Sequence, residues 1–221
     1  MRFITYSLLT VTILFSVQCG NKSDTSNQEL EDNKGIPQEG WVIDPTQRAV
    51  GKITPDVSEE DLRDAYGKEH VKSDTIWSED GTNFSIGTKL FANTKNEVQI
   101  IWENMEELKN PSQIIIQTKD SEWKTKDGIH IGTTLEELEK GNTKPFNVIS
   151  FEYEDGGIIS DWLGGKFANK YDGETGTEFL LTPSKPIDPV VFSKFKEDDV
   201  PSSHELLKSH GLRLAKMKFY F

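Results

Sequence analysis

The sequence predicts an α+β protein built from two tandem units, each a helix followed by an antiparallel sheet. Short segments with alternating apolar residues, such as 84–90 and 98–102, are separated by turns rich in Gly, Asn and Asp, which is typical of antiparallel strands. Two helix starts, at Ser58 and at Thr134, have an acidic residue three positions on, the spacing of a capping box. The two units can stay separate or join edge to edge in one continuous sheet, which would cover exposed strand edges.

The two halves of the chain align when the first is shifted by 76 residues. The alignment needs no gap over roughly 44 positions and keeps helix, strand and turn signals in phase. We therefore expect a first unit over residues 41–110, and a second over 111–221 that adds a C-terminal helix and strand. The aligned pairs include Ile53 with Ile129, Ser58 with Thr134, Leu62 with Leu138, Gly81 with Gly157, and Phe91–Asn93 with Phe167–Asn169.

The N-terminus reads as a secretory signal over residues 1–18. Arg2 precedes an apolar run from Phe3 to Val17, which is too short for a membrane-spanning helix. The only cysteine, Cys19, follows directly, and this arrangement resembles a bacterial lipoprotein precursor, in which that thiol is acylated. The sequence departs from the usual pattern at Gln18, as looser signals of the Bacteroidetes type do. An ordinary secreted protein with a cysteine in its signal is the alternative.

Residues 19–40 are predicted to form a disordered tether. The stretch from Gly20 to Gly40 lacks aromatic residues and is dominated by polar ones. A flexible coil of this length has a mean reach of roughly 25 Å. Gly20, in place of Asp after the cysteine, resembles a signal for outer-membrane sorting. We therefore expect a lipid-anchored protein of the bacterial cell envelope, with the outer membrane as its site and its side of the membrane left open.

The composition is that of an acidic, ordered globule. The formal net charge is −12, and removal of Arg2 with the signal makes the mature chain one unit more negative. This charge repels the phosphates of nucleic acid, so a nucleic-acid partner is excluded. Aromatic residues make up 10% of the chain, which favours a packed core. With one cysteine in the whole sequence, no disulfide can form within the chain.

A dense motif surrounds the second helix start. The run from Trp123 to Phe146 contains G-I-H-I-G-T-T-L-E-E-L-E, and E-Y-E-D-G-G and W-L-G-G-K follow it. This pattern resembles a set of uncharacterised bacterial lipoproteins, for which no activity is implied. More loosely, the tandem plan is similar to the β-lactamase-inhibitor protein and to small outer-membrane assembly lipoproteins. That second likeness concerns the fold and implies no function.

Motifs for catalysis and for cofactors are missing. The four histidines are scattered through the sequence, and no P-loop, H-E-x-x-H, G-x-S-x-G elbow or EF-hand pattern occurs. We therefore predict no catalytic residue, no cofactor and no metal site. The acidic loop Asp172–Glu174 is an alternative site for Ca²⁺, because its carboxylates are oxygen ligands.

The leading hypothesis is a non-catalytic module that binds another envelope protein. The alternative is an envelope hydrolase acting on glycans, because paired carboxylates near an aromatic residue can cleave a glycosidic bond. A purely structural envelope protein is the third reading. Trp123 and Trp162 are interpreted either as core residues or as surface anchors for a partner. The candidate binding surface consists of Trp123, Asp155, Gly156, Gly157, Asp161 and Trp162, with the hydrolase placed at Asp155 and Asp161.

Overall fold

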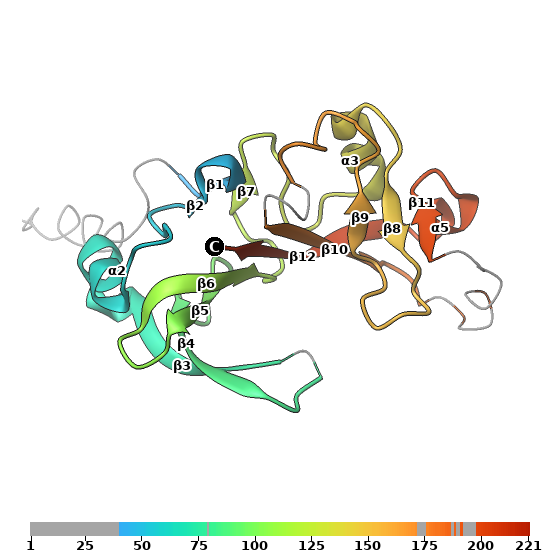
Figure 1. The fold of residues 1–221 in the computed structure, drawn as a ribbon. Helices are drawn as coiled ribbons and strands as arrows, with labels where there is room; N and C mark the ends of the chain where they lie inside the picture. Colours follow the sequence, from blue (N-terminus) through green and yellow to red (C-terminus); the bar gives the residue numbers. More distant parts are fainter. Residues whose placement is uncertain (1–39, 79, 172–175, 187, 189–190, 192–197) are drawn as a thin grey trace, which may run out of the picture. The chain divides into compact units, whose positions relative to one another are not determined.

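The computed structural model describes residues 40–78, 80–171, 176–186, 188, 191 and 198–221 (Figure 1). Three predictions fall outside these residues: the signal over 1–18, the lipid site at Cys19, and all of the 19–40 tether except Gly40. The acidic loop Asp172–Glu174 also lies outside them. These features therefore stay predictions.

The fold is α+β, as the sequence predicts, with short helices and a larger share of strand. The helices of the described residues are α2 (Glu59–Tyr66), α3 (Leu135–Asn142) and α5 (Glu205–Ser209), with 3-10 turns η1 (Pro45–Gln47) and η2 (Lys68–His70). The strands are β1 (Val42–Asp44), β2 (Ala49–Val50), β3 (Val71–Trp77), β4 (Phe84–Leu90), β5 (Val98–Asn104), β6 (Lys109–Ile116), β7 (Lys124–Thr125), β8 (Asn147–Ile149), β9 (Ile159–Asp161), β10 (Thr177–Pro183), β11 (Asp199–Pro201) and β12 (Leu212–Tyr220).

The strands of the described residues form three sheets rather than one continuous sheet. The largest has six antiparallel strands in the order β10-β12-β6-β5-β4-β3, so it draws strands from both halves of the chain (Figure 1). Its two parts meet where β6 pairs with β12, with Ile114 opposite Phe219 and Ile116 opposite Met217. The smaller sheets have the orders β2-β1-β7 and β11-β8-β9.

The expected boundary between Asn110 and Pro111 falls inside β6, two residues after the start of the strand. This strand is hydrogen-bonded to β5 along its length, for example at the pair of Ile100 and Ile114. It therefore belongs to the first unit, whose sheet is β3-β4-β5-β6, and a boundary after Ile116 fits the pairing better. The sequence signal at Pro111 was misleading, because a proline can stand in a strand where its missing N–H is not needed.

The two helix starts are confirmed in full. Ser58 and Thr134 each accept a hydrogen bond from the backbone of the residue three positions on, and the carboxylates of Asp61 and Glu137 accept from the cap backbones in return. The two eight-residue helices occupy positions that differ by 76 throughout. Each cap also makes a single bridge to the last strand of its unit, Ser58 to β6 and Thr134 to β12.

The second helix ends at Asn142, one residue after its glycine. Gly141 lies inside α3, and Thr143 takes the left-handed conformation beyond the helix, with φ of 66°. Gly141 is required by packing, because a Cβ there would lie 2.7 Å from the Phe167 ring. Its counterpart in the first helix is Ala65, which carries a methyl group at this position.

The strands that follow the two helices, β3 and β8, do not align at the shift of 76 residues that relates the helices. Val71 of β3 and Val148 of β8 are both buried on the core side, so a shift of 77 relates these strands. β8 is also shorter than β3, because it ends at Ile149 and a turn follows. The N–H of Tyr153 donates to the Ser150 carbonyl at 3.1 Å, which closes that turn.

Candidate functional site

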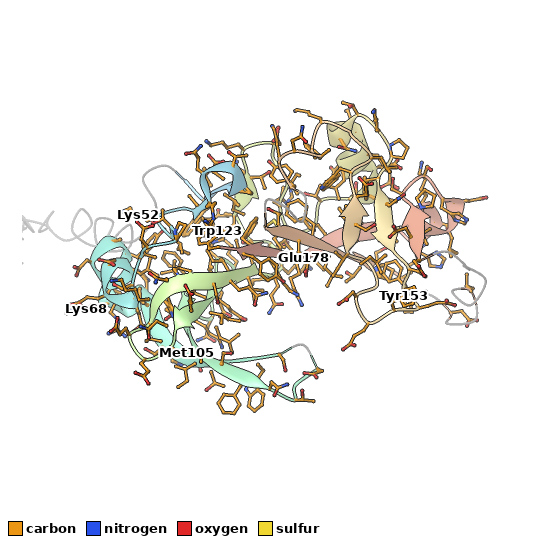
Figure 2. The ribbon with its side chains drawn as sticks, in the orientation of Figure 1. Lys52, Lys68, Met105, Trp123, Tyr153 and Glu178 are labelled. Carbon is orange, nitrogen blue, oxygen red and sulfur yellow. The ribbon has the colours of Figure 1, made fainter. Side chains whose placement is uncertain are left out.

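Trp123 is a core residue. Its side chain is fully buried, its ring centroid lies 5.0 Å from that of Trp41, and its Nε1 donates to the carbonyl of Asn96 at 3.0 Å (Figure 2). The indole N–H is therefore satisfied inside the protein, and the ring has no surface to offer a partner. The surface reading of Trp123 is wrong.

Trp162 is the centre of a second aromatic cluster. It is 2% exposed, and its ring lies 5.1 Å from Phe146 and 5.3 Å from Phe167, measured between centroids. Its Nε1 donates to the Tyr171 carbonyl at 2.6 Å. Among the described residues no ring contact joins this cluster to that of Trp123. The structure therefore does not bring the two tryptophans together into one concave site.

The remaining residues of the predicted surface form turns. Asp155 is exposed, and its carbonyl accepts from Ile158 at 3.2 Å. Gly156 is required there, because a Cβ would lie 2.5 Å from the backbone of Phe151, and Gly157 is buried. The carboxylate of Asp161 is exposed and accepts the N–H of the second residue after it at 2.7 Å. These contacts explain both aspartates as turn residues, and nothing in them favours a catalytic pair.

Asp127 holds the turn at the start of the D-G-I-H-I-G run. Its carboxylate accepts from Lys170 and from the Tyr171 hydroxyl, both at 2.8 Å, and pairs with Lys166 at 3.2 Å. Burial opposes ionisation of Asp127, but the hydrogen bonds from these three residues outweigh it and lower its pKa to about 2. Burial, together with the bond to Asp127, raises the pKa of Tyr171. The D-G-I-H-I-G run therefore acts as a structural anchor for the loop that carries Lys166 and Tyr171.

We expect Asp127→Asn to weaken the fold at neutral pH and to remove part of its acid sensitivity. A carboxyl group whose pKa is depressed on folding stabilises the fold above its unfolded pKa, and this contribution disappears as pH falls from about 4 to about 2. The variant should lose roughly 1–2 kcal/mol at pH 7, and the gap from the natural protein should close by about pH 2. Urea unfolding across this range measures both effects. Asp56→Asn, at an exposed carboxylate, is the control, and a gap that stays constant with pH would contradict the assignment.

A buried charge at the first helix was missed by sequence reasoning. Glu59 is 6% exposed and pairs with Arg63 at 2.5 Å. It also accepts a hydrogen bond from the hydroxyl of Thr88, which in turn accepts from Trp102 Nε1 at 2.9 Å. The position that corresponds to Glu59 in the second helix is Leu135. A three-residue acidic run at a helix start is commonly solvated, so only the packing of α2 on the sheet reveals which of its members is buried.

The β3–β4 hairpin carries the three most exposed large hydrophobic side chains of the described residues. Trp77, Phe84 and Ile86 are 60%, 62% and 53% exposed, and the rings of Trp77 and Phe84 lie 5.3 Å apart. Trp77 is directly opposite Phe84 in the ladder, so all three residues share one face of the hairpin. We call these three residues the hairpin patch.

The hairpin patch is the uncovered end of the core face of the sheet. Further along β4 on that face, Thr88 and Leu90 are fully buried. Pairing of β4 with β5 begins only at Gly87, so the part of the hairpin that carries Phe84 and Ile86 is paired with β3 alone (Figure 1). The apolar face of this hairpin is therefore buried at Thr88 and Leu90 and continues as exposed surface at Ile86 and Phe84.

A shallow groove of about 260 Å³ lies beside the same hairpin on the sheet. Gly87 shapes it, because a Cβ there would lie 2.4 Å from the Ile100 carbonyl and 2.5 Å from the side chain of Ile76. Ile76 can therefore lie flat against the sheet. The groove is lined by Ile76, Trp77, Phe84, Ile101, Ile115 and Lys218, together with four polar residues.

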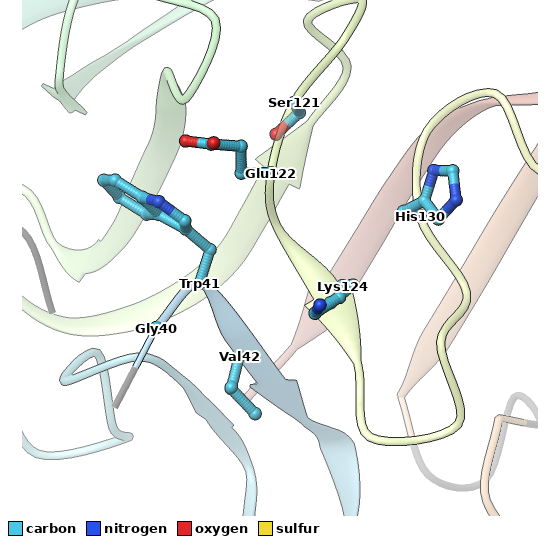
Figure 3. A pocket seen from close by; sticks show the side chains of 7 residues that line it. All are labelled: Gly40, Trp41, Val42, Ser121, Glu122, Lys124 and His130. Carbon is cyan, nitrogen blue, oxygen red and sulfur yellow. The ribbon is translucent and has the colours of Figure 1, made fainter. Parts of the chain in front are cut away.

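A second cleft, of about 500 Å³, lies where β1 and β7 meet (Figure 3). Trp41 and Glu122 stand on one side, and Lys124 and His130 line it further along the chain. The pKa of Glu122 is lowered by hydrogen bonds from Asn96 and from Lys95. The charges in this cleft are mixed in sign, so it shows no preference for a ligand class.

The described residues contain neither a cluster that could bind a metal ion nor a helix that could span a membrane. Within them, no group of three or more His, Cys, Asp or Glu side chains is placed to hold a metal ion. In the same residues, every helix is too short or too polar to cross a bilayer.

No protein family and no curated protein matches the chain. One solved structure, that of the uncharacterized protein YfeY from Escherichia coli, is similar with a TM-score of 0.44 and 14% sequence identity. The match covers 79% of this chain and 97% of that one. At this level the similarity carries no argument about function.

Proposed function

We propose that this protein is a lipid-anchored, non-catalytic binding module of the bacterial envelope, and that it contacts a protein partner through the hairpin patch. The observation that carries this proposal is the exposure of Trp77, Phe84 and Ile86 together on one face. Soluble monomers rarely leave large apolar side chains clustered in this way, and tryptophan and phenylalanine are enriched where proteins bind each other. A partner that covers the patch would bury apolar surface as a protein core does.

The predicted tether supports this role. A lipid at Cys19 followed by a flexible segment would hold the folded part near the membrane while leaving the hairpin free to reach a partner. Loss of lipid labelling in Cys19→Ala is the expected result, measured by metabolic incorporation of labelled palmitate. Label that persists in this variant would contradict an anchor at that residue.

The hydrolase alternative finds no support in the geometry of its residues. Asp155 and Asp161 are both exposed, and other residues line the two clefts described above. Catalytic carboxylates act across a bound sugar in a site that excludes water, and this pair has no such walls. We therefore propose the binding module alone.

The double variant Trp77→Ser, Phe84→Ser should lose its partner while keeping its fold. Both side chains are mostly exposed, so their replacement costs little stability. Central aromatic anchors typically contribute about 2 kcal/mol or more each to binding, so capture should fall at least tenfold. The measurement is capture of envelope proteins from solubilised membranes by the mature protein, quantified by mass spectrometry.

Two matched controls accompany this experiment. Met105→Ser removes an apolar side chain that is 52% exposed but lies in the β5–β6 turn (Figure 2), and it should leave capture unchanged. Asp155→Asn with Asp161→Asn should also leave it unchanged. Equal capture by the natural protein and the Trp77, Phe84 variant would overturn the hairpin patch as the binding surface.

A further inference from the structure

The second unit protects the outer edge of its first strand with a segment of its own chain. β11 pairs antiparallel with β8, and Val200 stands opposite Val148. The N–H of Ser150 donates to the Asp198 carbonyl at 2.8 Å, and the N–H of Ser202 donates to the Phe146 carbonyl at 2.7 Å. The edge of β8 is thus hydrogen-bonded over its whole length.

The corresponding edge in the first unit has no such cover. β3 is the last strand of the six-stranded sheet, and no described strand pairs with its outer side. The N–H of Phe91 donates to the His70 carbonyl, and the N–H of Ser78 donates to the Asn83 carbonyl. These two bonds show which alternate residues of β3 are hydrogen-bonded to β4. Backbone groups of Ser73 and Trp77 therefore point away from β4 and toward the open edge.

The difference comes from the length of one connection. In the second unit, β11 and α5 lie in the chain between β10 and β12. In the first unit, β5 and β6 are joined by a turn of four residues, 105–108, which has no strand to give. The two units have the same order of helix and strands, so β3 corresponds to β8. The antiparallel pairing of β11 with β8 is therefore a guide to how a strand can pair with the open edge of β3.

The helix position next to this edge carries opposite charges in the two units. In the second unit, Glu139 of α3 accepts from the Ser202 hydroxyl at 2.7 Å and pairs with Lys208 at 3.3 Å, so it holds the covering segment. The equivalent residue of α2 is Arg63, whose side chain is 38% exposed and lies 3.5 Å from the hydroxyl of Ser73. Arg63 pairs with Glu59, but a guanidinium has five donors and can bind a second carboxylate.

We infer that β3 receives an extended segment of a partner protein, added antiparallel along its open edge, with an acidic side chain bound by Arg63. This inference rests on the proposed function and specifies how the partner is held. Main-chain hydrogen bonds to Ser73 and Trp77 supply affinity, as in other cases of strand addition. An apolar side chain of the same segment covers the hairpin patch, and the acidic one gives specificity.

A second copy of this chain fits the edge less well. The residues of β3 on the side of α2 are Val71, Ser73, Thr75 and Trp77, and none of them is acidic. Pairing β3 with β3 of another copy would leave Arg63 without a new carboxylate. The carboxylate of Asp74 also accepts the outward N–H of Thr75 at 2.8 Å, which weakens that edge for unselective pairing.

Two synthetic peptides test the inference on the mature protein. Both are capped, alternate valine and threonine over seven residues, and differ only in a Glu or a Lys at the last valine position. The peptide with Glu should bind at least tenfold more tightly. It should also slow hydrogen exchange of the Ser73 and Trp77 amides at least tenfold at saturation, while the amide of Ile100 in the sheet centre stays unchanged.

Charge variants complete the test. Arg63→Gln should remove the preference for Glu over Lys, and Lys140→Gln on the exposed side of α3 should keep it. Because Arg63 also pairs with Glu59, circular dichroism must show that this variant is folded. The exchange measurement uses the natural sequence, so it decides the matter even where the variant does not fold.

The outcomes separate the two proposals. Equal affinity for both peptides, or no protection of Ser73 and Trp77 by either, would overturn strand addition. If capture from membranes still depends on Trp77 and Phe84 in that case, the binding module stands and only its mode is wrong. Protection by the Glu peptide together with capture that ignores the hairpin patch would keep strand addition and reject the patch.

Discussion

Replacement of Trp123 by alanine should lower the free energy of unfolding by about 4 kcal/mol, the range seen when large aromatic residues are removed from a core. The side chain is fully buried, packs edge to face on Trp41, and binds the carbonyl of Asn96. Its loss creates a cavity and leaves that buried carbonyl without its donor. Urea unfolding followed by circular dichroism measures the change.

Trp123→Phe separates packing from hydrogen bonding at the same position. Phenylalanine keeps most of the buried apolar surface and loses the Nε1 donor, so a cost of about 1–2 kcal/mol is expected. A phenylalanine variant as unstable as the alanine one would show that the bond to Asn96, and not the buried ring, holds the region. A loss under 1 kcal/mol in the alanine variant would contradict the buried position of Trp123.

Replacement of Asn142 by leucine should cost roughly 3 kcal/mol, although the side chains are similar in size. Asn142 is fully buried at the end of α3. Its Nδ2 donates to the carbonyls of Lys144 and Trp162, each at 3.0 Å, and its Oδ1 accepts from the backbone of Phe167 at 3.0 Å. Leucine would leave these backbone groups buried without partners, which costs about 1–3 kcal/mol for each group.

The result is checked by thermal and urea unfolding of Asn142→Leu beside Asn169→Leu. Asn169 is exposed, so its replacement should change stability by no more than about 0.5 kcal/mol. Asn142→Leu should also loosen the turn that carries Trp162, seen as faster hydrogen exchange at the Phe167 amide. Similar stability of the two variants would refute the role of Asn142 as the link between helix and turn.

Local signals in the sequence predicted the repeated helix starts correctly. A capping box is closed within four residues, so Ser58 and Thr134 mark where their helices begin, although packing must hold helices this short. The turn glycines and alternating strands give the antiparallel pairing for the same reason, since each ladder between neighbours is set by nearby residues. The α+β class follows from these local elements.

The structure buries both tryptophans of the candidate binding surface. In the sequence, Trp123 and Trp162 cannot be told apart from the exposed Trp77. A single tryptophan among polar residues does not indicate whether its side chain is buried. Burial of the first two depends on Trp41 and Phe146, which are distant in the sequence or on another element. Trp77 lies at the end of the hairpin where β4 is no longer paired with β5, since that pairing ends at Gly87.

The sequence by itself determined the α+β class, the doubled plan and the helix caps, because these depend on interactions between residues close in the chain. Only the tertiary structure decided that β6 and β12 join the units, that Glu59 and Asn142 are buried, and that β3 keeps an open edge. The physical reason is that strand order and burial arise from contacts between distant segments. The connection between β5 and β6 has four residues, and the one between β10 and β12 is much longer. This difference leaves the local sequence signals of the two units alike, but it determines which strand edge is covered.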